Sequence, residues 1–400
     1  MSIVVKNRTA YAVEVESEEG TYVAPQAATS YVQTLEDGAE FSPSKELLTR
    51  SVFNGSIGKT TPRTGMRAVS VALPCEFKAA ATEGGLPEYD ALMRSAMGLR
   101  RQVASLTLDD SDALGEATHS TTVLYLADAD KNKVSVGDIV TVKVDNAYHT
   151  SPVTAVTNAD GDVTVTLLVA MAAAPSNGDE LAAVTTYVTA ETGHPSLSVT
   201  KYMNDARIEE AHGCKVTSVE LSNFTTGQLA NWAFNLEGLD WDTKLGATPH
   251  TPAYSAALPP IILSACVYKD GVKVPVNELS ISLENTLGFV TSTCAPNGKT
   301  SSRPTDRTIS GSLNPYKEDD SVDNMTQFKN NDEFSLFAFA YIPDSDEDGE
   351  YGQVVAVYMP KCIITEIGEA DQDGLAQETI SFQASRGSDA STEELYISVS

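Results

Sequence analysis

The sequence has little of what a catalyst, a metal site or a secreted scaffold needs. Its 400 residues include five cysteines, five histidines and two tryptophans. The cysteines are odd in number and none has CxxC spacing, which argues for reduced core thiols. No two histidines have metal-ligand spacing, and the GxSxG, GxxxxGK[ST] and GxGxxG signatures are absent. We therefore expect no enzyme, and no catalytic, cofactor-binding or metal-binding residues.

Long apolar runs are also missing. No stretch approaches the ~18 residues that a membrane helix needs, and no charged-then-apolar signal segment follows Met1. We expect a chain that is made in the cytoplasm, stays soluble and has no membrane partner.

Basic residues are few. The chain has 27 Lys and Arg against 55 Asp and Glu, a formal net charge of −28. This excludes a protein that holds nucleic acid by neutralising phosphates. It is compatible with a conduit whose acidic wall keeps a polyanion from sticking, although solubility alone explains the charge equally well.

What the sequence does contain is an internal repeat. Arg67–Lys78 is echoed by Arg307–Lys317, and each copy reads as an Arg that opens an alternating strand, then a Pro, then an aromatic residue and Lys. Alternation places one set of side chains on a buried face of each strand. The sets are Val69, Val71 and Leu73 in the first copy, and Ile309, Gly311 and Leu313 in the second. An Arg at a strand entrance predicts a fixed carboxylate partner.

Two further matches follow in the same order. Ser196 is echoed by Ser335, and Cys214 by Cys362. The first anchors lie about 240 residues apart and the later ones about 140 to 150, so the front copy carries an insertion of about 100 residues. Five short strands between 121 and 188 predict a small barrel or sandwich there. Each copy also offers a helix, at 86–97 with Pro87 in its first turn, and at 322–330.

One acidic stretch resembles the start of a calcium loop. Asp344–Gly349 has carboxylates at alternate positions and a Gly for the turn. The twelfth position is Val355 instead of Glu, and the flanks read as strands. The pattern therefore favours a solvated acidic hairpin tip, and we expect no metal.

Residues 47–98 and 196–238 resemble the tail tube (major tail) proteins of long-tailed bacteriophages. In that family a strand, a glycine-bearing loop and a strand precede a short helix that ends in Gly. The resemblance implies all-β folding: two tandem β-sandwich domains with one short helix each, the first carrying the inserted small β domain. The boundaries would be 1–108 with 190–245, an insertion at 109–189, a linker at 246–260, and 261–400.

The resemblance also implies a function. Such proteins form stacked rings around a lumen that conducts DNA during ejection, and two domains per chain imply rings of three subunits. Loops 54–65 and 287–305 and segment 1–35 would contact neighbours, while the insertion would face outward. The implied partners are other copies, tape-measure, tail-tip and tail-terminator proteins, and DNA as transient cargo. The implied location is the virion tail.

Two other functions fit the composition. One is another tube or baseplate component of a contractile injection system. The other is a secreted or surface β-module protein that binds carbohydrate or mediates adhesion. The second needs secretion and usually an aromatic cluster, and the sequence shows neither.

Overall fold

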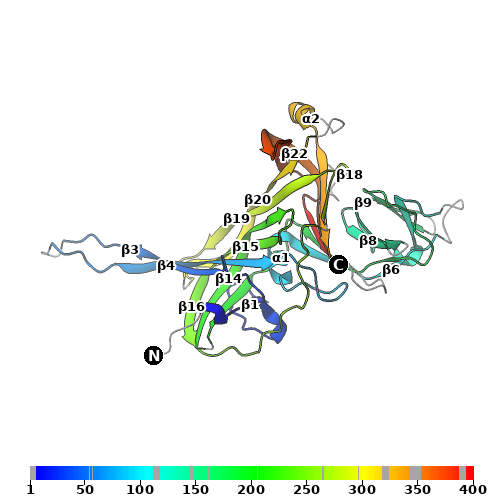
Figure 1. The fold of residues 1–400 in the computed structure, drawn as a ribbon. Coiled ribbons are helices and arrows are strands. Elements are labelled where there is room, and N and C mark those ends of the chain that lie inside the picture. Colours follow the sequence, from blue (N-terminus) through cyan, green and yellow to red (C-terminus); the bar gives the residue numbers. More distant parts are fainter. Residues whose placement is uncertain are drawn as a thin grey trace.

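The computed structural model is almost entirely β-structure, with two α-helices among the residues it describes (Figure 1). The description covers the chain except for residues 1–5, 54, 56, 111–117, 145–146, 160–161, 205, 264, 296, 318–323, 343–352 and 387–392. The expected fold class is confirmed: an all-β chain with a small inserted barrel.

The elements fall into two series with the same order, separated in the first series by an insertion. The first copy comprises β1 (Thr9–Val15), β2 (Tyr31–Val32), β3 (Glu40–Leu48), β4 (Arg63–Glu76), α1 (Asp90–Met97), β13 (Leu197–Met203), β14 (Arg207–Thr225), β15 (Asn231–Gly238) and β16 (Asp240–Leu245). The second copy comprises β17 (Ala265–Lys269), β18 (Val272–Lys273), β19 (Val276–Thr291), β20 (Lys299–Pro315), α2 (Asn324–Asn330), β21 (Phe334–Tyr341), β22 (Val354–Gln372), β23 (Leu375–Ala384) and β24 (Tyr396–Val399).

The two copies also pair their strands in the same way. β14 starts between β13 and β16 and then continues beside β15. β22 starts between β21 and β24 and then continues beside β23. Each long strand has a bulge shortly after this transition, at Thr217 and at Thr365. Because a bulge is a defined feature of a strand, the match aligns β14 with β22 residue by residue.

Eight strands join both copies into one antiparallel sheet, here called the shared sheet. Its order is β3, β4, β15, β14, β19, β20, β23, β22. Each copy adds an outer sheet. The outer sheets are β2–β1–β13–β14–β16 and β18–β17–β21–β22–β24, the latter extended by two strands of the insertion.

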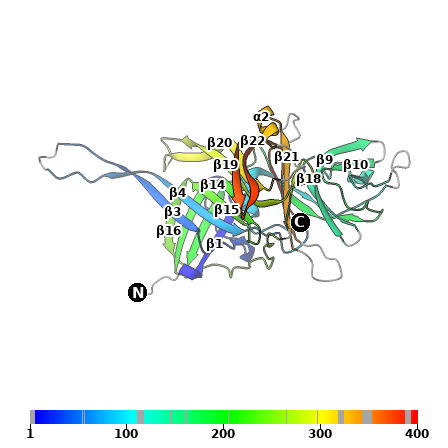
Figure 2. The same cartoon turned by 45° about the horizontal axis from the view of Figure 1, so that its top comes forward.

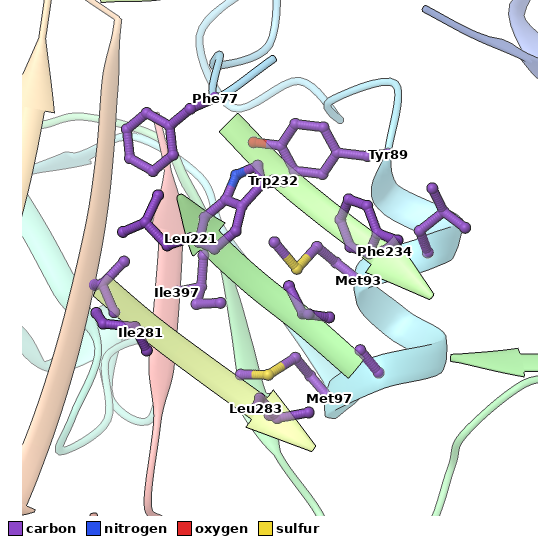
Figure 3. Close-up of a cluster of buried hydrophobic side chains, with 14 of the residues drawn as sticks. Phe77, Tyr89, Met93, Met97, Leu221, Trp232, Phe234, Ile281, Leu283 and Ile397 are labelled. Atoms are coloured by element: carbon purple, nitrogen blue, oxygen red, sulfur yellow. The ribbon is translucent and has the colours of Figure 1, made fainter. Parts of the chain in front are cut away.

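The core lies between these layers, as the alternation predicts. Val69, Val71 and Leu73 are buried, and so are Ile309 and Leu313 in the second copy. Around them one cluster gathers residues of both copies and of α1 (Figure 3). A fully buried side chain of this size contributes about 1.5 to 3 kcal/mol, so this cluster is the main stabilising element of the fold.

Helix α1 is shorter than the sequence suggests. It begins at Asp90, and Pro87 lies before it, in a turn in which its carbonyl accepts from the N–H of Asp90 at 2.9 Å. Met93 and Met97 are buried, as expected. Gly98 ends the helix with a φ of +93°, a conformation that glycine adopts without steric cost. The second helix is confirmed over Asn324–Asn330.

The insertion contributes eight strands, of which six form a separate sheet, here called the guest. The guest comprises β6 (Leu106–Thr107), β7 (Val123–Ala127), β8 (Ile139–Val144), β9 (Ala147–Ala159), β10 (Asp162–Leu167) and β11 (Glu180–Leu181). Its order is β6, β11, β8, β9, β10, β7, and Leu108 bridges to Leu126, so the sheet nearly closes on itself. It has its own apolar core.

The other two strands correct the sequence prediction. The last strand expected within the inserted domain, β12 (Val184–Thr189), instead pairs with β24 of the second copy. Its other neighbour is β5 (Gly98–Val103), which overlaps residues 99–120, a stretch whose composition predicts a polar link. The residues of β12 are buried throughout. A strand buried on both faces has no alternation that would reveal its partner sheet, which explains the error.

Three further expectations were wrong in detail. Arg67 and Arg307 lie inside their strands and do not open them, and β4 continues through Pro74. The missing N–H of Pro74 is tolerated because β3 pairs with β4 only as far as Ala72. The repeat also predicts that the loop 343–352 occupies the place of residues 203–213 in the first copy, but residues 207–213 belong to β14. The calcium-like stretch at 344–349 lies outside the described residues.

Candidate assembly surfaces

Within the chain, the copies meet where β14 pairs with β19, here called the internal seam. Ser218 lies opposite Glu284, and Leu221 lies opposite Ile281. Leu221 and Ile281 are both buried, so the seam has a core side and a hydrophilic side. The two copies are therefore joined by a continuous ladder as well as by side-chain packing.

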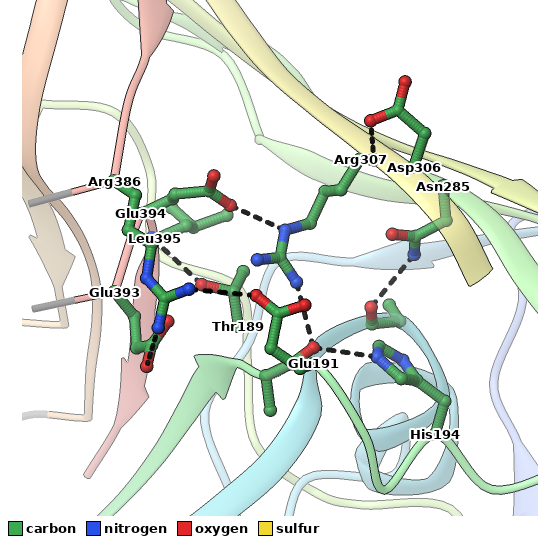
Figure 4. Close-up of polar contacts among 12 residues, drawn as sticks. Thr189, Glu191, His194, Asn285, Asp306, Arg307, Arg386, Glu393, Glu394 and Leu395 are labelled. Carbon is green, nitrogen blue, oxygen red and sulfur yellow. Dashed lines mark hydrogen bonds and ion pairs between the residues drawn. The ribbon is translucent and has the colours of Figure 1, made fainter. Parts of the chain in front are cut away.

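A buried amide reinforces the internal seam. Asn285 of β19 donates from Nδ2 to the carbonyl oxygen of Ala96 at 3.0 Å and to that of Val216 at 3.5 Å (Figure 4). Ala96 lies in the last turn of α1, whose carbonyls lack partners within the helix. The strand of the second copy thus contacts both the helix and the adjacent strand of the first.

Two edges of the shared sheet have no strand partner among the described residues. β3 pairs along its length with β4 alone, and the part of β22 after its bulge pairs with β23 alone. A free edge exposes N–H and C=O groups and is a template for another strand. β3 is the counterpart of β19, and β22 is the counterpart of β14. The free edges are therefore the same two elements that make the internal seam.

The face of the shared sheet opposite the core is hydrophilic, and most of the charged side chains described on it are carboxylates. Residues that lie opposite each other in neighbouring strands point to the same face. The register places on this face Glu40, Ser42, Ser44, Ala68, Ser70, Ala72, Ala233, Asn235, Glu237, Ser218, Glu220, Ser222, Ser280, Ser282, Glu284, Thr308, Ser310, Ser312, Thr379, Ser381, Gln383, Glu366 and Gly368. None of these is Lys or Arg, and Lys215, which lies opposite Glu237, is the one lysine that the pairing of β14 with β15 adds to this face. Lys215, at the rim, is buried and bonded to Glu19 at 3.0 Å.

The β3–β4 hairpin projects from the body, on the side opposite the guest (Figures 1 and 2). Loop 54–65 lies in this hairpin, as far as it is described. The hairpin carries five large apolar side chains that are exposed to solvent: Leu47, Leu48, Val52, Phe53 and Ile57. Such a patch marks an interaction surface.

The other two segments expected at neighbour contacts meet the opposite copy within the chain. In the loop 287–305, Asn297 accepts from the N–H of Arg67 at 2.7 Å and donates back to its carbonyl at 3.0 Å. In the N-terminal segment, Glu19 accepts from the N–H of Ser302 at 2.5 Å. Each copy therefore already serves as a neighbour to the other.

Two equivalent ion pairs tie the repeat together. Arg67 pairs with Asp240 at 2.5 Å. Arg307 pairs with Glu394 at 2.6 Å (Figure 4), so both expected carboxylate partners are confirmed. Asp240 begins β16, and Glu394 precedes β24, the counterpart of β16. Arg307 also donates to the carbonyl of Ala190 at 3.0 Å and is the less exposed of the two arginines.

The guest packs against the second copy, although it is inserted in the first. Ile139 and Val169 share a buried cluster with Phe337 and Tyr396. Gly137 fits here because a Cβ atom would lie 2.1 Å from the Tyr396 ring. The guest is thus attached by its packing as well as by its two connections.

An ion pair lies at this interface. Asp138 is bonded to Arg101 of β5 at 2.9 Å, and Arg101 lies over the Tyr396 ring. Burial raises the pKa of Asp138, and Arg101 only partly opposes this effect.

Among the residues that the structure describes, no group of three or more His, Cys, Asp and Glu could hold a metal ion. His194 has a structural role: its ring lies 2.9 Å from the carbonyl of Ser95 and 3.1 Å from that of Ala190. Cys75, Cys214 and Cys362 are buried thiols as expected, whereas Cys294 is exposed. In the described part of the chain, no helix is long and apolar enough to span a membrane.

The two copies are thus joined strand to strand, and two edges of the shared sheet have no strand partner among the described residues. The family model described as phage tail tube protein matches residues 6–384. The chain belongs to this family. It is therefore a structural component of the phage tail and of the virion. No curated protein matched the chain.

The candidate surfaces of this tail tube protein are backbone edges and a hydrophilic sheet face, and neither kind of surface has a sequence motif. The sequence showed the repeat and the resemblance predicted the fold, but neither located the free edges or the internal seam. The alternation of serine with glutamate along β14 and β19 was the available signal for the hydrophilic face. This alternation does not say which residues of neighbouring strands lie opposite each other, and only the observed strand pairing gives that register.

Proposed function

We propose that three copies of this tail tube protein close into a ring of six sandwich domains, and that rings stack into a tube that conducts DNA. The internal seam carries this proposal, because it shows one copy of the domain already pairing edge to edge with another. Repeating that junction between chains uses both free edges and leaves none exposed.

The hydrophilic face of the shared sheet would line the lumen. Serine, asparagine and glutamate offer no cation for a phosphate, so DNA would slide without being held. The guest, on the side of the molecule away from the β3–β4 hairpin, would lie outside, and the hairpin would reach a neighbouring ring. The protein would have no enzymatic activity, and tape-measure, tail-tip and terminator proteins would contact the ends of the tube.

Negative-stain electron microscopy of concentrated protein in moderate salt tests the proposal. We expect hollow tubes or rings with three outer projections. A variant in which Leu47, Leu48 and Phe53 are replaced by Ser should form rings that stack poorly. Protein that stays monomeric under all salt conditions, with or without preformed tail tips, would contradict it.

A further inference from the structure

We propose that β3 of a second chain pairs with β22 in the register that β19 adopts on β14 within the chain. This inference rests on the proposed ring and specifies its contact. It predicts that Glu366 lies opposite Ser44 of the second chain, and Gly368 opposite Ser42. On the core side, Ile367 would meet Pro43.

The register follows from two independent alignments of the copies. The bulges align Thr217 with Thr365, and hence Glu220 with Gly368. For the partner strand, Phe41 lies opposite Val71 as Ile281 lies opposite Gly311. Val71 lies opposite Leu236 of β15, and Gly311 lies opposite Phe382 of β23. Leu236 and Phe382 are equivalent positions of the two copies, so Val71 corresponds to Gly311 and Ser42 to Ser282. The observed pair Glu220–Ser282 therefore becomes Gly368–Ser42.

Helix α2 provides a separate observation. Both helices end at a residue with positive φ, Gly98 at +93° and Asn331 at +60°, which aligns Leu92 with Met325. Leu92 is fully buried, whereas Met325 is 52% exposed and Phe328, one turn further on, is 43% exposed. The adjoining strand β19 reaches the last turn of α1 through Asn285. β5 and β12 also pack against α1, and they have no counterpart in the second copy. The second chain's β3 would therefore cover the part of α2 nearest its last turn, around Phe328.

The chemistry of this predicted seam differs from that of the internal one. Lys45 stands where β19 has Asn285, and its ammonium would reach the carbonyl end of α2, where a cation is favoured. Pro43 replaces Leu283, and Glu369 replaces Leu221. The predicted seam is therefore less apolar than the internal seam, and an unassembled chain exposes less apolar edge. A slip of one residue would set Ile367, on the core side, opposite Ser42 or Ser44, which lie on the hydrophilic side of β3, and this mismatch favours the stated register.

Disulfide trapping tests the register directly. The variant Ser42→Cys with Gly368→Cys, in a background with Cys266→Ser and Cys294→Ser, is oxidised mildly after assembly. Gly368 has room for a side chain, because the nearest atom to a Cβ there is 3.8 Å away. Glu220→Cys with Ser282→Cys is the matched control and should form the same bond within one chain. Ser44→Cys with Gly368→Cys is displaced by two residues, about 7 Å, which a disulfide cannot span.

We expect covalent dimers and trimers from the Ser42/Gly368 pair and at least tenfold fewer from the Ser44/Gly368 pair. Tubes that give no cross-link at Ser42/Gly368, or more at Ser44/Gly368, would overturn the register and leave the proposed tube standing. Protein that forms neither tubes nor cross-links, while the internal control closes, would count against both.

A second variant tests this contact with α2. Phe328→Ser should reduce the assembled fraction several-fold in a pelleting assay. It should leave the melting temperature of the monomer unchanged, because the side chain is already exposed. Unchanged assembly, or a monomer that loses stability, would overturn this part of the inference.

Discussion

At the scale of single residues, the equivalent ion pairs Arg67–Asp240 and Arg307–Glu394 differ in their surroundings, so we expect them to contribute differently to the stability of the fold. Both arise from the same repeated position. The Arg67 side chain is 43% exposed, whereas that of Arg307 is 14% exposed and donates to the carbonyl of Ala190. Solvent screening weakens the first pair far more than the second.

We therefore predict unequal effects of substitution. Arg307→Ala should lower the free energy of unfolding by about 1.5 to 3 kcal/mol, because a half-buried charged hydrogen-bond network is lost. Arg67→Ala should cost less than about 1 kcal/mol, as for an exposed pair. Urea unfolding of the two variants beside the parent measures both values. Equal losses of stability would show that the lower exposure of Arg307 does not strengthen its ion pair.

His149 in the guest makes the free energy of unfolding depend on pH. Burial lowers its pKa, and its Nε2 lies 3.3 Å from the carbonyl of Val169. The unfolded state therefore binds more protons than the folded state as the pH falls through the ordinary range of histidine, near 6.5. Stability is full above that range and is lost on acidification.

The corresponding measurement is thermal unfolding at pH 7.5 and pH 5.5. The parent should lose more stability between these values than His149→Gln, which cannot be protonated. His250→Gln, in the connection between the copies, is the control and should behave as the parent. A parallel loss in both variants would assign the acid sensitivity to other groups.

At the scale of elements, the boundary between guest and host differs from the one expected. We propose 106–181 for the guest in place of 109–189, because β5 and β12 belong to the outer sheet of the second copy. These strands form a hairpin in which Val103 lies opposite Val184, and the guest replaces its turn.

Excision should follow that boundary. Replacing 104–183 by Asn-Gly restores a two-residue hairpin turn, so this variant should fold and assemble. Removing 114–189 deletes β12, leaves β24 with an open edge, and should give aggregated protein. Circular dichroism and size-exclusion chromatography distinguish the two. Aggregation of the first variant would mean that the apolar surface around Phe337 and Tyr396 needs the guest.

At the scale of the whole molecule, charge opposes assembly. Each chain carries −28, and a ring brings carboxylates of several chains together. The proposed assembly should therefore increase when salt is raised from about 20 to 300 mM, as repulsion is screened. Light scattering at fixed protein concentration measures this. Assembly that weakens with salt would indicate that attractive pairs, such as Lys45 with the end of α2, dominate the contact.

The internal repeat could be predicted from the sequence, but much of the strand pairing could not. The alternation of Val69, Val71 and Leu73 predicted a buried face, and the spacing of the anchors predicted an insertion. β12 was assigned to the wrong sheet because its partner, β24, lies far away in the sequence and both its faces are buried. The assembly surfaces could not be predicted for a related reason. A free edge is recognised only when all the strand pairings are known, and the sequence does not give these pairings.

The pairing of β12 with β24 has a consequence for synthesis. Val188 leaves the ribosome long before Tyr396, its partner. During that interval the strand has one bonded side, on β5, and one open side. Non-local pairing of this kind is slow and exposes an edge to other nascent chains. Folding of the insertion is therefore held incomplete until the second copy has been translated, and chains released early would retain an adhesive edge.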